Sequence, residues 1–484
     1  MTYDIIIVGS GLGGLSAGIC LAKQGKKVLI LEKNNIPGGL VTTFKVGRYE
    51  FDTSMYELYD YGTSEHVGAL QDILNDFHVD FHTSLALNTK IYYEDTKEFL
   101  EIKENIEDLF LELESRKSGS IEPLRDLLKV VKEIKEAQDA LLNNDFLEED
   151  YPSFMKYLTY NASDALIDLK IPKETIDRIS YVCLYLGSPL KKLSFIDLAC
   201  FLYTYIFKKV VISTDKNLNF IFQLLKEYKA SDGKIEYESK VTKIEDKEQY
   251  IEVITNNKTY RASKVICDLP IRYVYKELID DKEKYPLCNA KTYSPSTFMV
   301  FLGLNKDYQT IGFNNYHYIH MNSNSNKVYK DMNNLFHSNW EAYVPNVIQE
   351  YASPKGTTIM TFKISFNSDA WNKVTEKDYA TLKEQVASHI IQEFEETFKI
   401  DVKEYIEEIE IASPLTISRY SNSVNGTIMG SMRIGYDNVI NRVLDKENND
   451  RIYFVGADSY LGGGIHNTIL NGTLVAKEIT RKED

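Results

Sequence analysis

The chain has 484 residues and a formal net charge of −15, with 56 Lys and Arg against 71 Asp and Glu. Its apolar fraction of 43% and charged fraction of 26% are those of ordinary globular proteins, which excludes a disordered or collagen-like chain. The acidic balance argues against a nucleic-acid-binding protein, because phosphate recognition normally needs a basic surface. The length predicts two or three domains. The 34 Tyr and 22 Phe either fill a core or line a cavity.

The five cysteines are scattered and form no CxxC pair, which is typical of reduced thiols in a cytoplasmic protein and argues against a zinc site. We expect no metal ion. The N-terminus lacks the basic region of a signal peptide, and glycines interrupt it. No transmembrane helix is expected, and the apolar run Phe195–Phe207 is predicted to be a buried helix rather than one that dips into a membrane. We therefore expect a cytoplasmic protein, with membrane association left open.

The first elements form a βαβ unit. Tyr3–Val8 has the β-branched, apolar composition of a buried parallel strand. A glycine-rich turn follows, and then Leu15–Gln24 has the spacing of a helix that stops at Gly25. Lys27–Glu32 is predicted to be the second strand. Such a unit, in about thirty residues, is typical of nucleotide-binding domains.

Farther along, residues 96–150 are predicted to be helical and strongly charged, either as an amphipathic pair with one solvated face or as a lid over a site. A helix at Asn219–Tyr228 precedes several short strands that end near Asp268. The remaining predicted elements are strands at Lys291–Leu304, Thr357–Phe366 and Arg451–Gly456, a helix at Thr381–Phe398 and a last helix from about Thr468. This order predicts a nucleotide-binding α/β domain built from separated segments, with an α+β domain inserted into it.

The turn Gly9–Gly14 satisfies the GxGxxG pattern with Gly9, Gly11 and Gly14. Glycines at these places allow a tight turn, close approach of the backbone to a pyrophosphate, and close packing of helix on strand. The helix N-terminus then offers free N–H groups and a positive dipole end to phosphates. Glu32 ends the second strand, where a carboxylate accepts both ribose hydroxyls and disfavours a 2′-phosphate. The pattern therefore predicts FAD or NAD rather than NADP.

Two further glycine-rich stretches favour FAD over NAD. The pair Gly38-Gly39 directly follows the second strand and lets the backbone approach a ligand already bound at the first turn. Near the C-terminus, the strand before Gly456 runs into Asp458, and Gly462–Ile465 leads into the final helix. A strand, an acid and a glycine-rich helix entry suit a polyol chain and a flat ring.

These stretches, together with GRYEFDTS, KVICDLP and SPLTISRYSNSVNGTIMGS, resemble the amine-oxidase-type flavoprotein superfamily. Within it the chain is most similar to the phytoene desaturase, carotenoid isomerase and retinol saturase group. The resemblance implies a Rossmann-like FAD-binding domain of the glutathione-reductase type with an inserted α+β substrate-binding domain. The FAD-binding domain is expected at residues 1–65, 213–272 and 420–484, and the substrate domain at 66–212 and 273–419, with the helical subregion at 96–150.

The same resemblance implies non-covalent FAD and a set of residues around it. One group would hold the ADP half: Gly9, Ser10, Gly11, Leu12, Gly14, Glu32 and Lys33. Gly38, Gly39 and Leu40 would pass near the pyrophosphate and flavin, and Val241 would clamp the adenine. Gly456, Asp458, Gly464 and Ile465 would lie by the ribityl chain and the isoalloxazine.

Departures from the family pattern concern the reaction more than the cofactor. Leu40 stands where related sequences often have Arg, and Ser54 stands where Gly is usual. His466 stands at a place that the family commonly fills with Pro. His466 and Tyr56 are the candidate catalytic residues: histidine titrates near neutrality, and Tyr56, with Tyr59 and Tyr61, follows the expected flavin-proximal turn. His317 and His320 are expected on opposite faces of one strand, with no joint metal site.

The leading hypothesis is an FAD-dependent enzyme that desaturates, saturates or isomerises carbon–carbon bonds of an apolar unsaturated substrate such as a polyene, retinoid or unsaturated lipid. One alternative is an amine or porphyrinogen-type oxidase. Another is a non-enzymatic protein of the same fold that binds prenyl groups or lipids. An apolar small molecule is the expected partner, with peripheral membrane contact left open and no nucleic acid.

Overall fold

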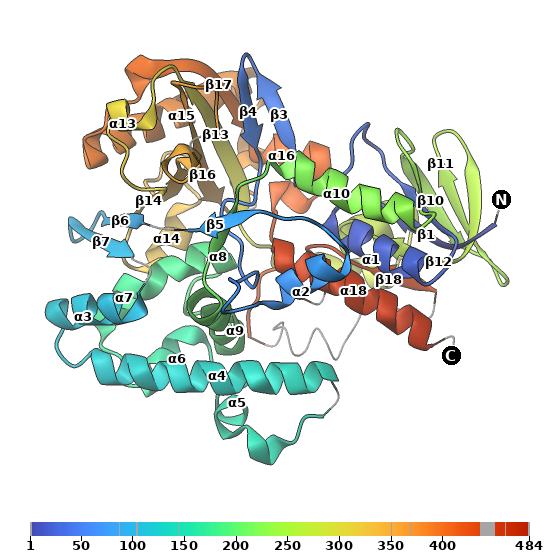
Figure 1. The fold of residues 1–484 in the computed structure, drawn as a ribbon, viewed down its shortest axis with the longest axis horizontal. Helices are drawn as coiled ribbons and strands as arrows, with labels where there is room; N and C mark the ends of the chain where they lie inside the picture. The colour runs from blue at the N-terminus through green and yellow to red at the C-terminus, as the bar shows by residue number, and fades with distance from the viewer. Residues whose placement is uncertain are drawn as a thin grey trace.

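The computed structural model describes residues 2–86, 88–102, 105–143, 145–349, 351–367, 369–435, 451–459 and 461–482. Parts of the predicted segment 420–484 lie outside these residues. Two 7-stranded sheets dominate the fold. Figure 1 shows them on opposite sides of the molecule, with a helical region below the second sheet.

The first sheet has the order β10-β11-β12-β1-β2-β9, and β18 also pairs with β12. Its central strands are parallel, so their carboxyl ends share one edge. The strands are β1 (Thr2–Val8), β2 (Val28–Leu31), β9 (Lys234–Glu236), β10 (Val241–Asp246), β11 (Ile251–Thr255), β12 (Thr259–Cys267) and β18 (Ile452–Phe454). They come from the N-terminal, middle and C-terminal parts of the chain, while the predicted domain boundaries themselves stay a prediction.

Three helices pack on this sheet: α1 (Leu12–Lys23), α10 (Asn217–Ala230) and α18 (Ile465–Arg481). The closest approach is between α1 and α18, because a Cβ at Gly472 would lie 2.1 Å from the Ser16 hydroxyl. The last helix begins at Ile465, three residues before the predicted start, so its first turn lies beside the glycine turn of α1.

The second sheet has the order β17-β13-β16-β15-β14-β6-β7 and is antiparallel except for the β14–β6 pair. Its strands are β6 (Thr89–Tyr93), β7 (Glu98–Ile102), β13 (Ser296–Leu304), β14 (His317–Met321), β15 (Trp340–Tyr343), β16 (Thr358–Phe366) and β17 (Ile406–Ala412). The long helix α15 (Glu376–Phe398) packs against it through Phe394 and Ile390. The hairpin β3 (Thr43–Val46) and β4 (Tyr49–Asp52) connects the two halves, since Tyr49 and Phe51 pack on Phe301 of β13.

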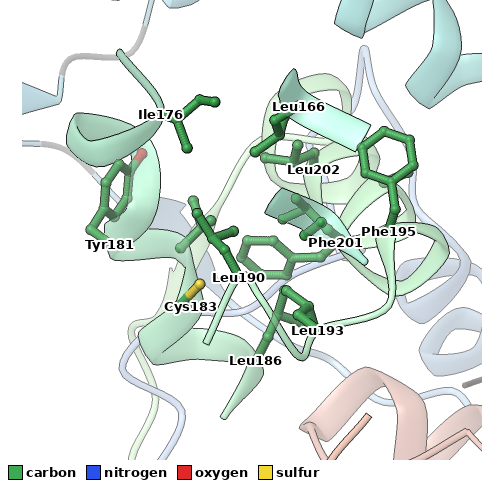
Figure 2. Close-up of a cluster of buried hydrophobic side chains, with 14 of the residues drawn as sticks. Leu166, Ile176, Tyr181, Cys183, Leu186, Leu190, Leu193, Phe195, Phe201 and Leu202 are labelled. Atoms are coloured by element: carbon green, nitrogen blue, oxygen red, sulfur yellow. The ribbon is translucent and has the colours of Figure 1, made fainter. Parts of the chain in front are cut away.

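The region 96–150 differs from its prediction as a wholly helical segment. It begins with strand β7, in which Leu100 and Ile102 are buried in the core. The two helices α3 (Ile106–Arg116) and α4 (Ile121–Asn143) follow this strand. Short helices follow: α5 (Pro152–Tyr157), α6 (Ala162–Asp168), α7 (Lys173–Ile179) and α8 (Cys183–Leu186). Their apolar faces meet in the buried cluster of Figure 2.

The helix α9 spans Phe195–Phe207, the range that its composition predicts. Phe195 and the neighbouring Leu198 are buried in the same cluster, and Asp197 is fully buried as well. Among the described residues, each helix is too short or too polar to cross a membrane. The remaining elements are α2 (Ala69–Asp76), β5 (Thr83–Leu85), β8 (Val211–Ser213), α11 (Ile271–Tyr273), α12 (Lys284–Asn289), α13 (Tyr308–Ile311), α14 (Ser325–Asp331) and α16 (Pro414–Ser421).

Candidate functional site

A cavity of about 610 Å³ opens at the carboxyl edge of the parallel sheet. Most of the residues predicted to hold the cofactor line it: Gly9, Ser10, Gly11, Leu12, Glu32, Lys33, Gly38, Gly39, Leu40, Val241, Gly456, Asp458, Gly464 and Ile465. The exception is Gly14, which lies behind the turn and packs against Gly9. Segments from three distant parts of the sequence therefore meet around one cavity.

The glycine turn between β1 and α1 has no room for side chains. A Cβ at Gly14 would lie 2.5 Å from the carbonyl oxygen of Gly9, and one at Gly11 would lie 2.6 Å from Asp268 Oδ2. Gly9 also has a φ of +101°, which non-glycine residues rarely adopt. Gly11 caps α1 without a side-chain hydrogen bond, so backbone N–H groups at this helix N-terminus face the cavity.

Glu32 is buried at the end of β2 and ties the turn together. Its Oε2 accepts hydrogen bonds from the Ser10 backbone N–H at 3.0 Å and the Ser10 hydroxyl at 2.5 Å. Its Oε1 accepts one from the Asn34 backbone N–H at 2.8 Å. The carboxylate that the motif predicts for a ribose is thus held rigidly at the cavity wall.

Asp268 is a site residue that the sequence reasoning missed. It follows β12, lines the cavity and accepts a hydrogen bond from the Gly14 backbone N–H at 3.0 Å. Burial raises its pKa to about 6, despite the opposing effect of that hydrogen bond. Asp268 lies 254 residues after Gly14 and reaches the turn only because β12 pairs with β1, so the spacing rule that singled out Glu32 did not find it.

The far end of the cavity is also built from backbone. Gly38, Gly39, Gly456 and Gly464 have positive φ values, and Gly464 begins α18 without a side-chain cap. The N-termini of α1 and α18 and a buried carboxylate line one cavity, which suits a ligand with a ribose and a pyrophosphate. The residues present therefore fit a dinucleotide.

A second cavity of about 510 Å³ adjoins the first. The two share lining residues from three regions, among them Ser54, Met299 and Gly464. Many of the walls of the second cavity are aromatic: Tyr56, Tyr59, Tyr185, Phe201, Tyr329 and Tyr343. Part of the Tyr and Phe content therefore lines a cavity, while Tyr61 does not and bonds the Phe81 carbonyl oxygen in the core instead.

The candidate catalytic residues His466 and Tyr56 both line the second cavity, and burial shifts the pKa of each side chain away from its usual value. Burial, together with the charges of Arg433 and Lys135, lowers the pKa of His466 to about 3, so the imidazole is neutral at pH 7 instead of titrating there. Burial holds the pKa of Tyr56 well above its usual value. The Tyr56 hydroxyl donates to the Asp52 carbonyl oxygen, which ties it to the end of β4.

A buried set of charged residues also reaches this cavity, and we call Glu57, His317, Glu341 and Lys363 the Glu57 cluster. His317 Nδ1 lies 3.5 Å from Glu57, and its Nε2 lies 3.7 Å from Glu341. Lys363 Nζ lies 2.8 Å from Glu341 Oε2. Burial raises the pKa of Glu341, but Lys363 and His317 outweigh it and lower that pKa to about 2.

The histidines of β14 lie in different surroundings. His317 stacks on Tyr343 with ring centroids 4.2 Å apart, whereas His320 stacks on Trp340 at 5.2 Å. No group of His, Cys, Asp and Glu side chains within the described ranges is arranged to hold a metal ion. Sequence reasoning placed His317 in a core or surface role because its carboxylate neighbours come from other segments.

Solved structures with similar folds span the whole chain. An oxidoreductase from Methanosarcina mazei has a TM-score of 0.65 at 15% identity and covers 99% of this chain and 100% of its own. A putrescine oxidase bound to putrescine has a TM-score of 0.67 at 13% identity and covers 99% of both chains. A family model described as an NAD(P)-binding Rossmann-like domain matches residues 7–75. The fold is therefore the one that these oxidoreductases share, and it contains a Rossmann-like dinucleotide-binding domain.

Proteins that are similar to the chain in sequence indicate a more specific group of enzymes than the fold does. The chain is 23% identical to the chloroplastic prolycopene isomerase of Daucus carota, over 99% of this chain and 80% of the relative. It is 22% identical to the 1-hydroxycarotenoid 3,4-desaturase of a Flavobacterium strain, over 97% and 98%. It is also 22% identical to the all-trans-retinol 13,14-reductase of Danio rerio, over 88% and 77%. The chain is thus homologous to the carotenoid isomerase, carotenoid desaturase and retinol reductase group, which confirms the resemblance that its motifs indicate.

Proposed function

We propose that this protein is an FAD-dependent enzyme that desaturates, saturates or isomerises carbon–carbon bonds of an apolar unsaturated substrate. The observation that carries the proposal is the junction of the two cavities. A cavity that fits a dinucleotide meets an aromatic one at Ser54, Met299 and Gly464. The names of the relatives agree, since they act on a carotenoid or a retinol.

The shape of the first cavity supports FAD as the particular flavin. The turn at Gly9–Gly14 and Glu32 suit an ADP half. The cavity then continues past Gly39 to Asp458 and the start of α18, which leaves length for a ribityl chain and a ring. When bound, FAD would supply the redox chemistry at the carbon–carbon bond.

The chain itself would position the reactants and exclude water. The N-terminus of α18 at Gly464 brings a positive dipole end to the junction, which favours negative charge there. The aromatic walls offer contact to a flat unsaturated chain. His466, being neutral, can accept or share a hydrogen bond but carries no ready proton at pH 7.

Spectroscopy of the purified protein tests the proposal. We expect the absorbance of oxidised flavin, release of FAD on heat denaturation, and an anaerobic spectral change with at least one polyene, retinoid or unsaturated lipid. Reduction of the flavin by the compound indicates desaturation, oxidation of pre-reduced flavin indicates saturation, and turnover without net change indicates isomerisation. A colourless protein, or a flavin that responds to amines and to no unsaturated lipid, contradicts the proposal. The cytoplasmic location and peripheral membrane contact stay predictions.

A further inference from the structure

The hydroxyl of Tyr185 stands out in the second cavity. Tyr185 lies within the short helix α8, and it lines the cavity wall. Its oxygen is buried, and no group within the described part of the chain forms a hydrogen bond with it. A buried hydroxyl without a partner is unfavourable and therefore needs an explanation, and a bound ligand is one.

Burial and then the charge of the Glu57 carboxylate raise the pKa of Tyr185, so the two groups lie close enough to interact. The two side chains share a neighbour, because Tyr59 lies 5.7 Å from the Tyr185 ring and donates to Glu57 Oε2 at 2.7 Å. The Glu57 side chain is 6% exposed and lines the same cavity. A carboxylate has about four acceptor sites, and Tyr59 and His317 use only part of them.

The Glu57 cluster carries balanced charges, which bears on what it can bind. Burial lowers the pKa of His317, but Glu57 and Glu341 outweigh it and raise that pKa above its usual value. Two carboxylates face two basic side chains, His317 and Lys363. Each carboxylate of the cluster therefore already has a basic partner, which argues against a cationic ligand.

The other charged groups that line this cavity include two ion pairs. Arg433 Nη1 lies 3.1 Å from Asp197, and Lys135 pairs with Asp139, while Asp60 and Lys477 line the cavity as well. Tyr185 can donate a hydrogen bond here, and Glu57 can accept one. An alcohol is both a donor and an acceptor and satisfies the two at once, whereas an ammonium group cannot accept and a carboxylate cannot donate.

We propose that Tyr185 and Glu57 form a subsite for a hydroxyl group on the unsaturated substrate. The substrate hydroxyl donates to the Glu57 carboxylate and accepts from the Tyr185 hydroxyl. This inference rests on the proposed function, because it specifies the substrate as a hydroxylated polyene. It makes Tyr185 a specificity-determining residue for one end of that molecule.

Paired ligands and one isosteric substitution test the subsite in the flavin-loaded protein. The probes are all-trans-retinol, the matched hydrocarbon in which hydrogen replaces the hydroxyl, retinylamine and retinoic acid, with Kd taken from anaerobic flavin spectra. We expect the wild type to bind the alcohol about tenfold more tightly than the hydrocarbon. Tyr185→Phe should reduce that preference to about twofold without changing the Kd of the hydrocarbon, and Glu57→Gln should reduce it as well.

Tyr181→Phe is the matched control. Tyr181 is equally aromatic, lies in the cluster of Figure 2 and is 6.4 Å from Tyr185 between ring centroids, but its hydroxyl contacts Tyr205 and it does not line the cavity. The control should keep the tenfold preference for the alcohol. If Tyr181→Phe and Tyr185→Phe both keep it, the subsite is not at Tyr185 and the inference is overturned.

Other outcomes separate this inference from the proposed function. A flavin that responds equally to the alcohol and the hydrocarbon overturns the subsite and leaves the proposed function standing. Tightest binding of retinylamine or retinoic acid also overturns the subsite, because the charge balance of the Glu57 cluster would then be different from the one described. A flavin that responds to no polyene overturns both.

Discussion

The two cavities of this protein are built in different ways. The walls of the first include glycines at strand ends and helix starts, several of which leave no room for a side chain. The second takes its walls from side chains that α4, α9, β13, β16 and α18 bring together. A cofactor shared by many enzymes can be recognised by local backbone geometry, whereas a particular substrate needs side chains assembled by the tertiary fold. Substitutions in the two cavities should therefore fail in different ways.

The largest effect is expected from Gly14→Val, behind the glycine turn that lines the first cavity. A Cβ there would lie 2.5 Å from the Gly9 carbonyl oxygen, and this backbone cannot move without opening the strand–turn–helix unit. We expect loss of nearly all bound flavin and a fall of at least about 3 kcal/mol in the free energy of unfolding. The flavin-to-protein absorbance ratio and thermal melts measure both.

Gly25→Asn is the control for that change. Gly25 also has a positive φ, but a Cβ there meets nothing within 4 Å, and Asn tolerates the left-handed region. This variant should keep its flavin. Equal flavin loss in the two variants would show that the glycine turn is not a special feature of the first cavity.

This contrast also explains how much the sequence predicted. The βαβ unit, Glu32 and the glycines at residues 38–39 and 464 are local patterns, and the structure brings them to one cavity. The Glu57 cluster was not predicted, since Glu57, His317, Glu341 and Lys363 become neighbours only when β14, β15 and β16 pair and the segment after β4 packs beneath them. The strand Glu98–Ile102 was missed because its charged neighbours resemble those of the helices that follow, and pairing with β6 decides its conformation.

Beside the second cavity, the largest effect is expected from Asp197→Asn, because its partner Arg433 lines that cavity. Asp197 is fully buried on α9 and pairs with Arg433, which also donates to the Leu461 carbonyl oxygen beside the entry to α18. The substitution keeps the side-chain volume but removes a buried charge pair, so we expect a loss of about 2–3 kcal/mol in unfolding free energy. Flavin binding should weaken less than the affinity for substrate does.

Asp126→Asn is the matched control, because Asp126 forms an exposed i,i+3 pair with Lys129 on α4. Exposed pairs contribute little, so its melting temperature should stay near that of the wild type. Thermal melts and flavin content of the two variants decide the comparison. If Asp197→Asn behaves like Asp126→Asn, the pair does not anchor the second cavity.

A smaller, pH-dependent effect is expected from His317→Gln. The pKa of His317 is higher in the folded protein than in the unfolded chain. Protonation of His317 therefore stabilises the fold, and this contribution is complete below the unfolded pKa of about 6.5. The contribution is lost as the pH rises through the pKa of the folded state. The variant should therefore be less stable than the wild type by about 1–2 kcal/mol near pH 6, with a smaller difference near pH 9. Urea melts across this range measure the difference, and His66→Gln, an exposed histidine, should show none of it. A difference that grows with pH would contradict the assigned sign.

The smallest effect is expected from His466→Gln, although His466 lines the second cavity and was the first candidate for catalysis. Removal of a general acid or base typically lowers a rate by about 100-fold or more. Burial and the nearby Arg433 and Lys135 lower the pKa of His466 to about 3, so its imidazole is neutral around pH 7. A neutral imidazole contributes shape and can form a hydrogen bond, but it does not supply a proton. We expect less than about a tenfold loss in turnover with an unsaturated substrate, and a pH–rate profile of unchanged shape. If the variant instead loses a titration near pH 6.5, binding of cofactor or substrate must restore the usual pKa of His466, and the chemistry of the second cavity would depend on the occupant of the first.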